Sequence, residues 1–206
     1  MLFSSLASNN LSKNQTMSLR NVIIIISLYN SVCNADIVVI SHFSNSTLND
    51  WQQKSFKDYT QYQLISLSGQ PVLQAKSTAT ASSLYKEVHV DLLKTPYLNW
   101  SWRIEKKLPI SNEQSKQGDD FTARIYLILK GKWFFWQTKA INYVWANHSP
   151  INSAWENPFA GANVMMIAVR SKNDQTQQWY TEKRNVLADF KTYFGDISVP
   201  IERRST

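Results

Sequence analysis

The 206-residue chain is short of the residues that usually carry catalysis or break regular structure. It holds one cysteine, five glycines, six prolines and three histidines. So few glycines and prolines exclude a fibrous or low-complexity chain. No two of the histidines share a metal-ligand spacing and no Gly-x-Ser-x-Gly motif occurs, so a zinc site and a serine nucleophile elbow are not expected.

Long runs of charge are missing as well. The formal net charge is +7, from 22 basic and 15 acidic residues, and no basic run exceeds two residues. Two of the basic residues, Lys13 and Arg20, lie in the first 35 positions, which contain no acid, so the remaining chain carries +5. This mild and scattered excess does not predict a nucleic-acid partner.

The N-terminal residues instead have the pattern of a secretory leader. Arg20 precedes an apolar run at residues 22–29, and small and polar residues follow up to Ala35. The apolar run is too short to span a bilayer, which needs roughly 20 residues. We expect residues 1–35 to be a signal peptide, with Met17 as a possible true start. Alternatively, the apolar run is a buried strand.

Cleavage after Ala35 would have three consequences. It would remove Cys33, leaving a mature chain without disulfide or thiol chemistry. It predicts a periplasmic or secreted protein without a transmembrane helix. The remaining residues, 36–206, are then expected to form a single domain, since 43% hydrophobic residues suffice for one substantial core.

The middle of the chain shows the two-residue period of half-buried strands. At residues 97–104 Trp100 and Trp102 alternate with polar side chains, and the same pattern recurs at residues 121–129. A further run begins at Trp133, so these pieces predict neighbouring antiparallel strands with Trp100 and Trp102 in the core.

Shorter runs with strand character occur on both sides of this region. They lie at residues 37–40, 62–67, 72–75, 84–90, 140–146, 164–169, 177–184 and 197–201. Residues 68–71 predict a hairpin turn, and residues 105–117 and 147–163 predict long loops. Asn185 and Gly195 frame the only helical pattern. The predicted fold is all-β, a jelly-roll-like sandwich of about ten strands with one short C-terminal helix.

Five ordered blocks resemble a known family. They read KTPYLNWSWRIE at 94–105, GDDFTARIY at 118–126, NYVWANH at 142–148, WENPFAGANVMMIAVRS at 155–171 and RNVLADFKTYFG at 184–195. Together they are similar to the bacterial family known as domain of unknown function 3047. The resemblance implies an exported bacterial protein with a β-sandwich fold, and it brings no activity and no catalytic residues.

Asp119 and Asp120 form the only adjacent acidic pair. Carboxylate oxygens can bind Ca²⁺, and paired carboxylates roughly 5 to 9.5 Å apart hydrolyse glycosidic bonds. Adjacent side chains of an extended chain point to opposite faces, so hydrolysis needs a second acid, for which the candidates are Glu113, Glu156 and Glu182. A structural alternative pairs one aspartate with Arg103 or Arg124.

Two further groups are candidates for ligand binding. Arg103 and Arg124 lie on the polar faces of their expected strands and, if these strands pair, share one surface with Asn99, Tyr126 and Asn142. An aromatic group suits sugar recognition, because ring faces stack on sugar rings while amides bind hydroxyls. Its members are Tyr143, Trp145 and Trp155, with Asn147, His148 and Asn157 nearby.

The functional expectation is an exported, non-catalytic β-sandwich protein that binds a cell-envelope ligand such as a saccharide. The candidate ligand-binding residues are Arg103, Asp119, Asp120, Arg124, Tyr126, Trp145, His148, Trp155 and Asn157. One alternative is a polysaccharide hydrolase or lyase centred on Asp119 and Asp120. The other is a purely structural envelope protein. No cofactor is expected, apart from possible Ca²⁺ at the two aspartates.

Overall fold

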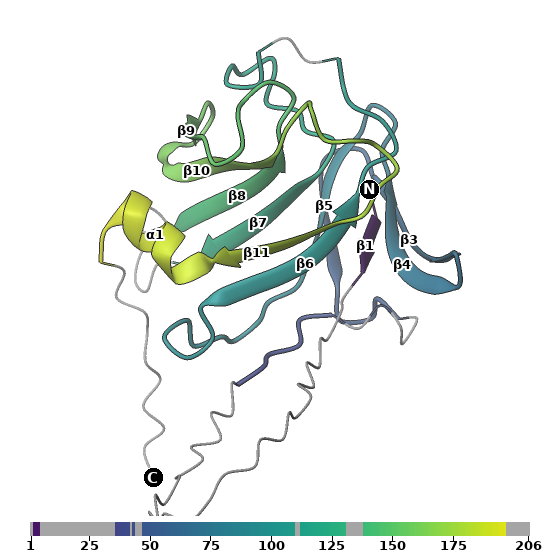
Figure 1. Cartoon of the computed structure of the whole chain (residues 1–206), viewed down its shortest axis with the longest axis horizontal. Helices are drawn as coiled ribbons and strands as arrows, with labels where there is room; N and C mark the ends of the chain where they lie inside the picture. The colour runs from purple at the N-terminus through teal and green to yellow at the C-terminus, as the bar shows by residue number, and fades with distance from the viewer. Residues whose placement is uncertain are drawn as a thin grey trace, which may run out of the picture.

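A computed structural model describes residues 36–41, 43, 47–109, 112–130 and 138–196, together with the backbone pairing of residues 2–4. In this part of the chain there are eleven strands and one helix (Figure 1). The elements are β1 Leu2–Ser4, β2 Gln52–Lys57, β3 Gln61–Leu67, β4 Gln70–Lys76, β5 Ala81–Tyr85, β6 Tyr97–Arg103, β7 Arg124–Leu129, β8 Lys139–Trp145, β9 Ala154–Asn157, β10 Gly161–Arg170, β11 Tyr180–Asn185 and α1 Val186–Phe194. The all-β prediction with one short helix is confirmed.

The strands form three sheets. A five-stranded sheet has the order β11-β6-β1-β4-β3, a four-stranded sheet has the order β7-β8-β10-β9, and β2 pairs with β5. Pairing is antiparallel except between β8 and β10, which run parallel. β7 pairs antiparallel with β8. The expectation that residues 97–104 lie beside residues 121–129 is wrong, because β6 lies in the other large sheet. The jelly-roll connectivity stays a prediction.

The main core lies between the two larger sheets. Trp100 and Trp102 of β6 are buried, as predicted from their spacing. The Trp100 ring stacks on Tyr143 of β8 with centroids 5.4 Å apart, and Trp102 lies 5.7 Å from Trp145. Because each pair joins one sheet to the other, aromatic packing holds the two layers together. The inter-sheet core comprises Trp100, Trp102, Ile104, Ala123, Ile141, Tyr143, Trp145, Ile167, Val169, Val186 and Phe190.

The β3–β4 hairpin and α1 follow from local sequence. Ser68 and Gly69 both have positive φ, 51° and 79°, which a two-residue hairpin turn requires. Asn185 caps α1 by accepting a hydrogen bond from the Ala188 amide at 3.0 Å. Gly195, with φ of 75°, follows the last helical residue. Phe190 anchors the helix in the inter-sheet core.

Other expectations differ from the structure. No strand is assigned to residues 36–41, although a strand was predicted at 37–40. The expected loop at 147–163 contains β9 and the start of β10, and the polar strand β2 was not predicted. The strands expected from Trp133 and at 197–201 lie outside the described residues.

β1 lies within residues 1–35, the predicted leader, and pairs with both β4 and β6. Across the described residues, no helix is long and apolar enough to cross a membrane.

Candidate functional site

The four-stranded sheet has a second buried cluster on its outward face, the face that points away from the inter-sheet core. The cluster consists of Phe121, Val144, Ala146, Trp155, Met166 and Ala168. The strand register aligns one residue from each strand in a row across this face: Tyr126 on β7, Asn142 on β8, Met166 on β10 and Trp155 on β9. Residues paired in this way project on the same side of a sheet. The row therefore combines a phenol, an amide and an indole.

Among the residues that the structure describes, two polar groups in this row have no hydrogen-bond partner. Asn142 is 0% exposed, and neither its amide nitrogen nor its amide oxygen is paired. The indole N–H of the buried Trp155 is also unpaired. An unpaired buried polar group costs about 1–3 kcal/mol, so native proteins contain few of them. The outward face therefore contains two donor groups and one acceptor that are buried without a partner among the described residues.

The network beside the row contains three residues singled out from the sequence. The Asp119 carboxylate accepts a hydrogen bond from the Asn157 amide at 3.1 Å. Arg124 donates to the Asp119 carbonyl at 2.8 Å and lies 3.5 Å from its carboxylate. The Asn157 side-chain oxygen accepts from the backbone amides of Phe159 and Ala160. The network thus fastens the loop before β7 to the turn between β9 and β10.

Exposed aromatic rings and cations surround this network. Tyr126 is 44% exposed and Phe159 is 66% exposed. The Arg124 guanidinium lies 4.9 Å from the centroid of the Phe121 ring and 5.9 Å from that of Tyr126. The Lys116 ammonium lies 5.7 Å from the Phe159 centroid. Cations and aromatic rings therefore lie together at the edge of the buried cluster.

The structure therefore brings together Asp119, Arg124, Tyr126, Trp155 and Asn157 from the predicted set. Asp120 follows Asp119 on the same loop and is exposed.

Three predicted residues lie elsewhere. Arg103 is in the five-stranded sheet, where it pairs with Glu105 at 3.1 Å. Trp145 is in the inter-sheet core and donates to the Ser171 carbonyl at 3.2 Å. His148 is in the loop after β8. Since β6 and β7 do not pair, the surface expected to join Arg103 with Arg124 does not form.

Glu113 has a structural role that sequence reasoning missed. Its buried carboxylate accepts hydrogen bonds from the backbone amides of Asn147, His148 and Ser149. Burial alone would raise the pKa of Glu113, but these hydrogen bonds and one from the Ser149 side chain outweigh it and lower the pKa below its usual value. Glu113 therefore fastens the 112–118 loop to the loop after β8.

Two of the three glutamates considered as catalytic partners already bind other protein groups. Glu113 is held by three amides, and Glu182 binds Arg170 and the Trp102 indole. Glu156 is exposed and adjoins Trp155 in β9, so it points to the opposite side of the sheet. Within the described ranges there is no group of three or more His, Cys, Asp or Glu side chains that could hold a metal ion. Ca²⁺ at Asp119 and Asp120 stays a prediction.

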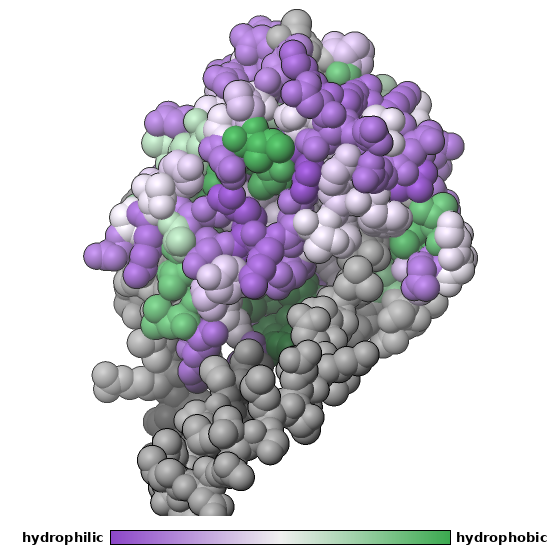
Figure 2. Space-filling view, viewed as in Figure 1, coloured by the Kyte–Doolittle hydropathy of each residue, from purple (hydrophilic) through white to green (hydrophobic). Residues whose placement is uncertain are grey.

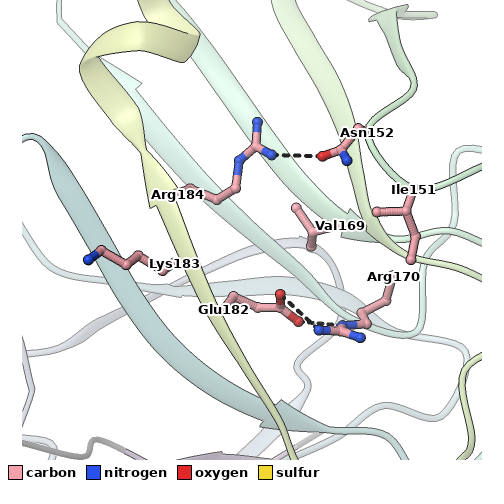
Figure 3. A pocket seen from close by; sticks show the side chains of 7 residues that line it. All are labelled: Ile151, Asn152, Val169, Arg170, Glu182, Lys183 and Arg184. Carbon is pink, nitrogen blue, oxygen red and sulfur yellow. Dashed lines mark hydrogen bonds and ion pairs between the residues drawn. The ribbon is translucent and has the colours of Figure 1, made fainter. Parts of the chain in front are cut away.

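A hollow of about 230 Å³ lies where the two large sheets meet. Figure 3 shows Arg170 of β10 beside Glu182 of β11, and Arg184 reaching Asn152, while Lys183 extends the other way. Arg170 makes two hydrogen bonds to Glu182, at 2.5 and 3.2 Å, and a third to Asp174.

Arg184 binds Asp189 of α1 at 2.7 Å, and the buried Tyr143 hydroxyl donates to the same carboxylate at 2.6 Å. Each arginine in the hollow therefore has its charge balanced by a carboxylate. The face of the molecule seen in Figure 2 is mainly hydrophilic with separate hydrophobic spots. We interpret this hollow as a seam that joins the sheets rather than as a ligand site.

Sequence reasoning also missed Phe159 as a site residue. It directly follows Pro158 in the loop predicted at residues 147–163, and a large apolar residue in a turn is the signal that could have identified it. Of the surface expected to join Arg103, Arg124, Asn99, Tyr126 and Asn142, the register places Tyr126 directly opposite Asn142.

Comparison with known proteins gives one match. A family described as "Protein of unknown function (DUF3047)" matches residues 49–203. No curated protein and no solved structure shows significant similarity. The match spans all five blocks noted in the sequence and well over half of the chain. The chain therefore belongs to the family described as protein of unknown function (DUF3047).

Proposed function

We propose that this chain is an exported, non-catalytic β-sandwich protein that binds a saccharide of the cell envelope on the outward face of its four-stranded sheet. One observation carries the proposal. The cross-strand row places the unpaired Asn142 amide and the unpaired Trp155 indole N–H in line with the exposed ring of Tyr126. Export rests on the residue pattern at positions 17–35.

The chemistry of the row fits a sugar. A pyranose presents apolar C–H groups on its ring faces and hydroxyls around its edge, so it needs a stacking surface next to directional polar groups. Tyr126 supplies the stacking surface, and rotation of its exposed side chain opens a path to Asn142. The Asn142 amide can donate to one hydroxyl and accept from another, while the Trp155 indole only donates.

The surrounding network fits the same role. Asp119, Arg124 and Asn157 hold one another in place, so their remaining donors and acceptors are preorganised at the edge of the row. Phe159 adds a second exposed ring on the neighbouring turn.

The sharpest test is Asn142→Leu. Replacing the unpaired buried amide with an apolar side chain of similar size removes a cost of about 1–3 kcal/mol, so the variant is expected to be more stable than the parent. The same change removes the hydrogen bonds to the ligand, so binding is expected to be lost. Urea unfolding measures stability, and a glycan array with isothermal titration of the best hit measures binding.

Tyr126→Ala tests the stacking surface separately. Loss of an aromatic contact worth about 1.4 kcal/mol weakens binding about tenfold. Tyr59→Ala is the matched control, because Tyr59 is an exposed tyrosine in the connection between β2 and β3. Equal loss of binding in both tyrosine variants would contradict the assigned face.

The alternatives predict other results. Turnover of a polysaccharide that stops in Asp120→Asn would replace the binding proposal with the hydrolase or lyase alternative. Absence of both binding and turnover, with the Asn142 variant simply more stable, would favour a structural envelope protein.

A further inference from the structure

β1 is the middle strand of the five-stranded sheet, and it is short for that position. It spans three residues and pairs with two residues of β4 and three of β6, whereas β4 and β6 span seven residues each. Both neighbours run antiparallel to β1, so β4 and β6 lie parallel to each other with this single strand between them. Neighbouring strands lie about 4.8 Å apart, so β4 and β6 cannot pair directly while a strand separates them.

The position between β4 and β6 is covered on both faces. In β4 the successive residues Val72 and Leu73 are both buried, and in β6 the successive residues Ser101 and Trp102 are both buried. Successive residues of a strand point to opposite faces. A strand that fits between β4 and β6 is therefore expected to be apolar throughout rather than alternating.

Residues 37–40 have that character. They read Ile-Val-Val-Ile, a run of β-branched residues favoured in strands, yet the structure assigns no strand to them. Ile37 is 81% exposed, and Val38 and Val39 are also exposed. The run begins two residues after Ala35, where the leader is expected to be cleaved. Its C-terminal end is anchored by the buried Phe43, whose ring lies 6.3 Å from that of Trp51.

We propose that removal of residues 1–35 allows residues 37–41 to take the place of β1 and to pair antiparallel with both β4 and β6. The inference rests on the export part of the proposed function. Cleavage removes β1 and leaves buried backbone groups of β4 and β6 unpaired, each costing about 1–3 kcal/mol. It also gives the exposed apolar run a free end. Five extended residues span about 17 Å, which covers more of β4 and β6 than three residues do.

The test uses the protein exported from a bacterium with its own leader. Mass spectrometry identifies the first residue, and hydrogen–deuterium exchange reports on residues 37–41, β4 and β6. With Asp36 as the first residue, the amides of residues 37–41 are expected to exchange at least about 100-fold more slowly than in an unstructured peptide. Rapid exchange there would overturn the strand replacement while leaving export intact.

A pair of variants tests the same point independently. Val39→Pro removes a backbone N–H and is excluded from a central strand, whereas Val39→Thr keeps the N–H and β-branching. Faster exchange in β4 and β6, or failure to fold, in the proline variant alone supports the proposal. The proposal is overturned if the proline variant folds normally and its β4 and β6 amides exchange as slowly as in the parent. It is also overturned if a second copy of the chain protects β4 and β6 from exchange while residues 37–41 exchange rapidly.

The test of strand replacement can fail independently of the test of saccharide binding. A purified chain that retains residues 1–35 overturns both export and strand replacement. Saccharide binding is decided by Asn142→Leu and Tyr126→Ala, which lie in the other large sheet.

Discussion

At the scale of single residues, only glycine fits at position 118, because the backbone of Asn112 in the same loop passes close to it. A Cβ atom at this position would lie 1.9 Å from the carbonyl oxygen of Asn112, and backbone atoms cannot move aside as the end of a flexible side chain can. Gly118→Ala is therefore expected to lower the free energy of unfolding by about 2 kcal/mol, measured by urea denaturation. Gln117→Ala, at the exposed neighbouring position, is the control. Equal stability of the two variants would contradict the predicted clash.

The Glu113 carboxylate predicts a dependence of stability on pH. Its pKa is lower in the folded than in the unfolded protein, so its contribution is complete above the unfolded value, about 4.3, and is lost as pH falls through the folded value. Glu113→Gln is expected to lose about 2 kcal/mol at pH 7, because one amide oxygen replaces two carboxylate oxygens facing three N–H donors. The gap between parent and variant should therefore narrow as pH falls below the unfolded value toward the lower folded one.

Unfolding in urea at pH 7, 5 and 3.5 measures this gap. The exposed Glu156→Gln variant serves as the control and is expected to stay within about 0.5 kcal/mol of the parent. A gap for Glu113→Gln that is the same at all three pH values would show that charge is not involved.

Residue-level prediction from sequence worked where one strand face was clearly more apolar than the other. In β6 Trp100 and Trp102 alternate with Asn99 and Ser101, and both tryptophans are buried as predicted. In β8 both faces are buried, so alternation could not show that Trp145 points toward the five-stranded sheet. The role of Glu113 depends on contacts with amides 34 to 36 residues away, which no local pattern encodes.

At the scale of elements, the Arg170–Glu182 pair connects β10 in one sheet with β11 in the other. Both side chains are largely buried, so removing Arg170 leaves the Glu182 charge without its cation, and removing Glu182 leaves Arg170 with Asp174 as its remaining carboxylate. Arg170→Ala and Glu182→Ala are each expected to cost about 3 kcal/mol, with a coupling energy of about 2 kcal/mol in a double-mutant cycle measured by urea unfolding.

The Lys86–Asp50 pair provides a matched comparison. Its carboxylate is well exposed, and its atoms lie 3.2 Å apart. Coupling there is expected to stay below about 1 kcal/mol. Similar coupling energies for the two pairs would show that burial does not set the strength of the Arg170–Glu182 interaction.

Elements with strong local signals were predictable. The hairpin of β3 and β4, strands β6, β7, β8 and β10, and helix α1 with Asn185 as its cap all follow from periodicity and turn chemistry. β2 was missed because its residues are mostly polar and exposed. β9 was missed because its four residues stand between loop-like segments rich in Asn, Ser and Pro.

At the scale of the whole molecule, local patterns did not decide which strands pair. β6 and β7 are close in sequence, and their similar alternation suggested that they were neighbours, yet they lie in different sheets. The parallel pairing of β8 and β10 has no local signal either, since it depends on how the connection through β9 is placed. Of the residues singled out from the sequence, only those on the four-stranded sheet and its loops lie together, and their role as a binding site stays a prediction.

The seam between the two large sheets and the outward face of the four-stranded sheet differ in how their polar groups are satisfied. Along the seam between them, arginines and carboxylates neutralise one another. On the outward face of the four-stranded sheet, an amide and an indole stay unpaired. The paired charges of the seam stabilise the contact between the sheets. Under our proposal, the unpaired groups of the outward face bind the ligand.

The pairing of β6 with β11 also bears on how the chain reaches its native state. Residues 80 positions apart meet across these strands, as Ser101 and Thr181 do. Topologies dominated by such distant contacts fold slowly, in milliseconds to seconds, because a large loop must close before the contacts form. During synthesis the five-stranded sheet cannot be completed until β11 has emerged from the ribosome. Under our export proposal, this delay would keep the polypeptide unfolded for passage through a translocation channel.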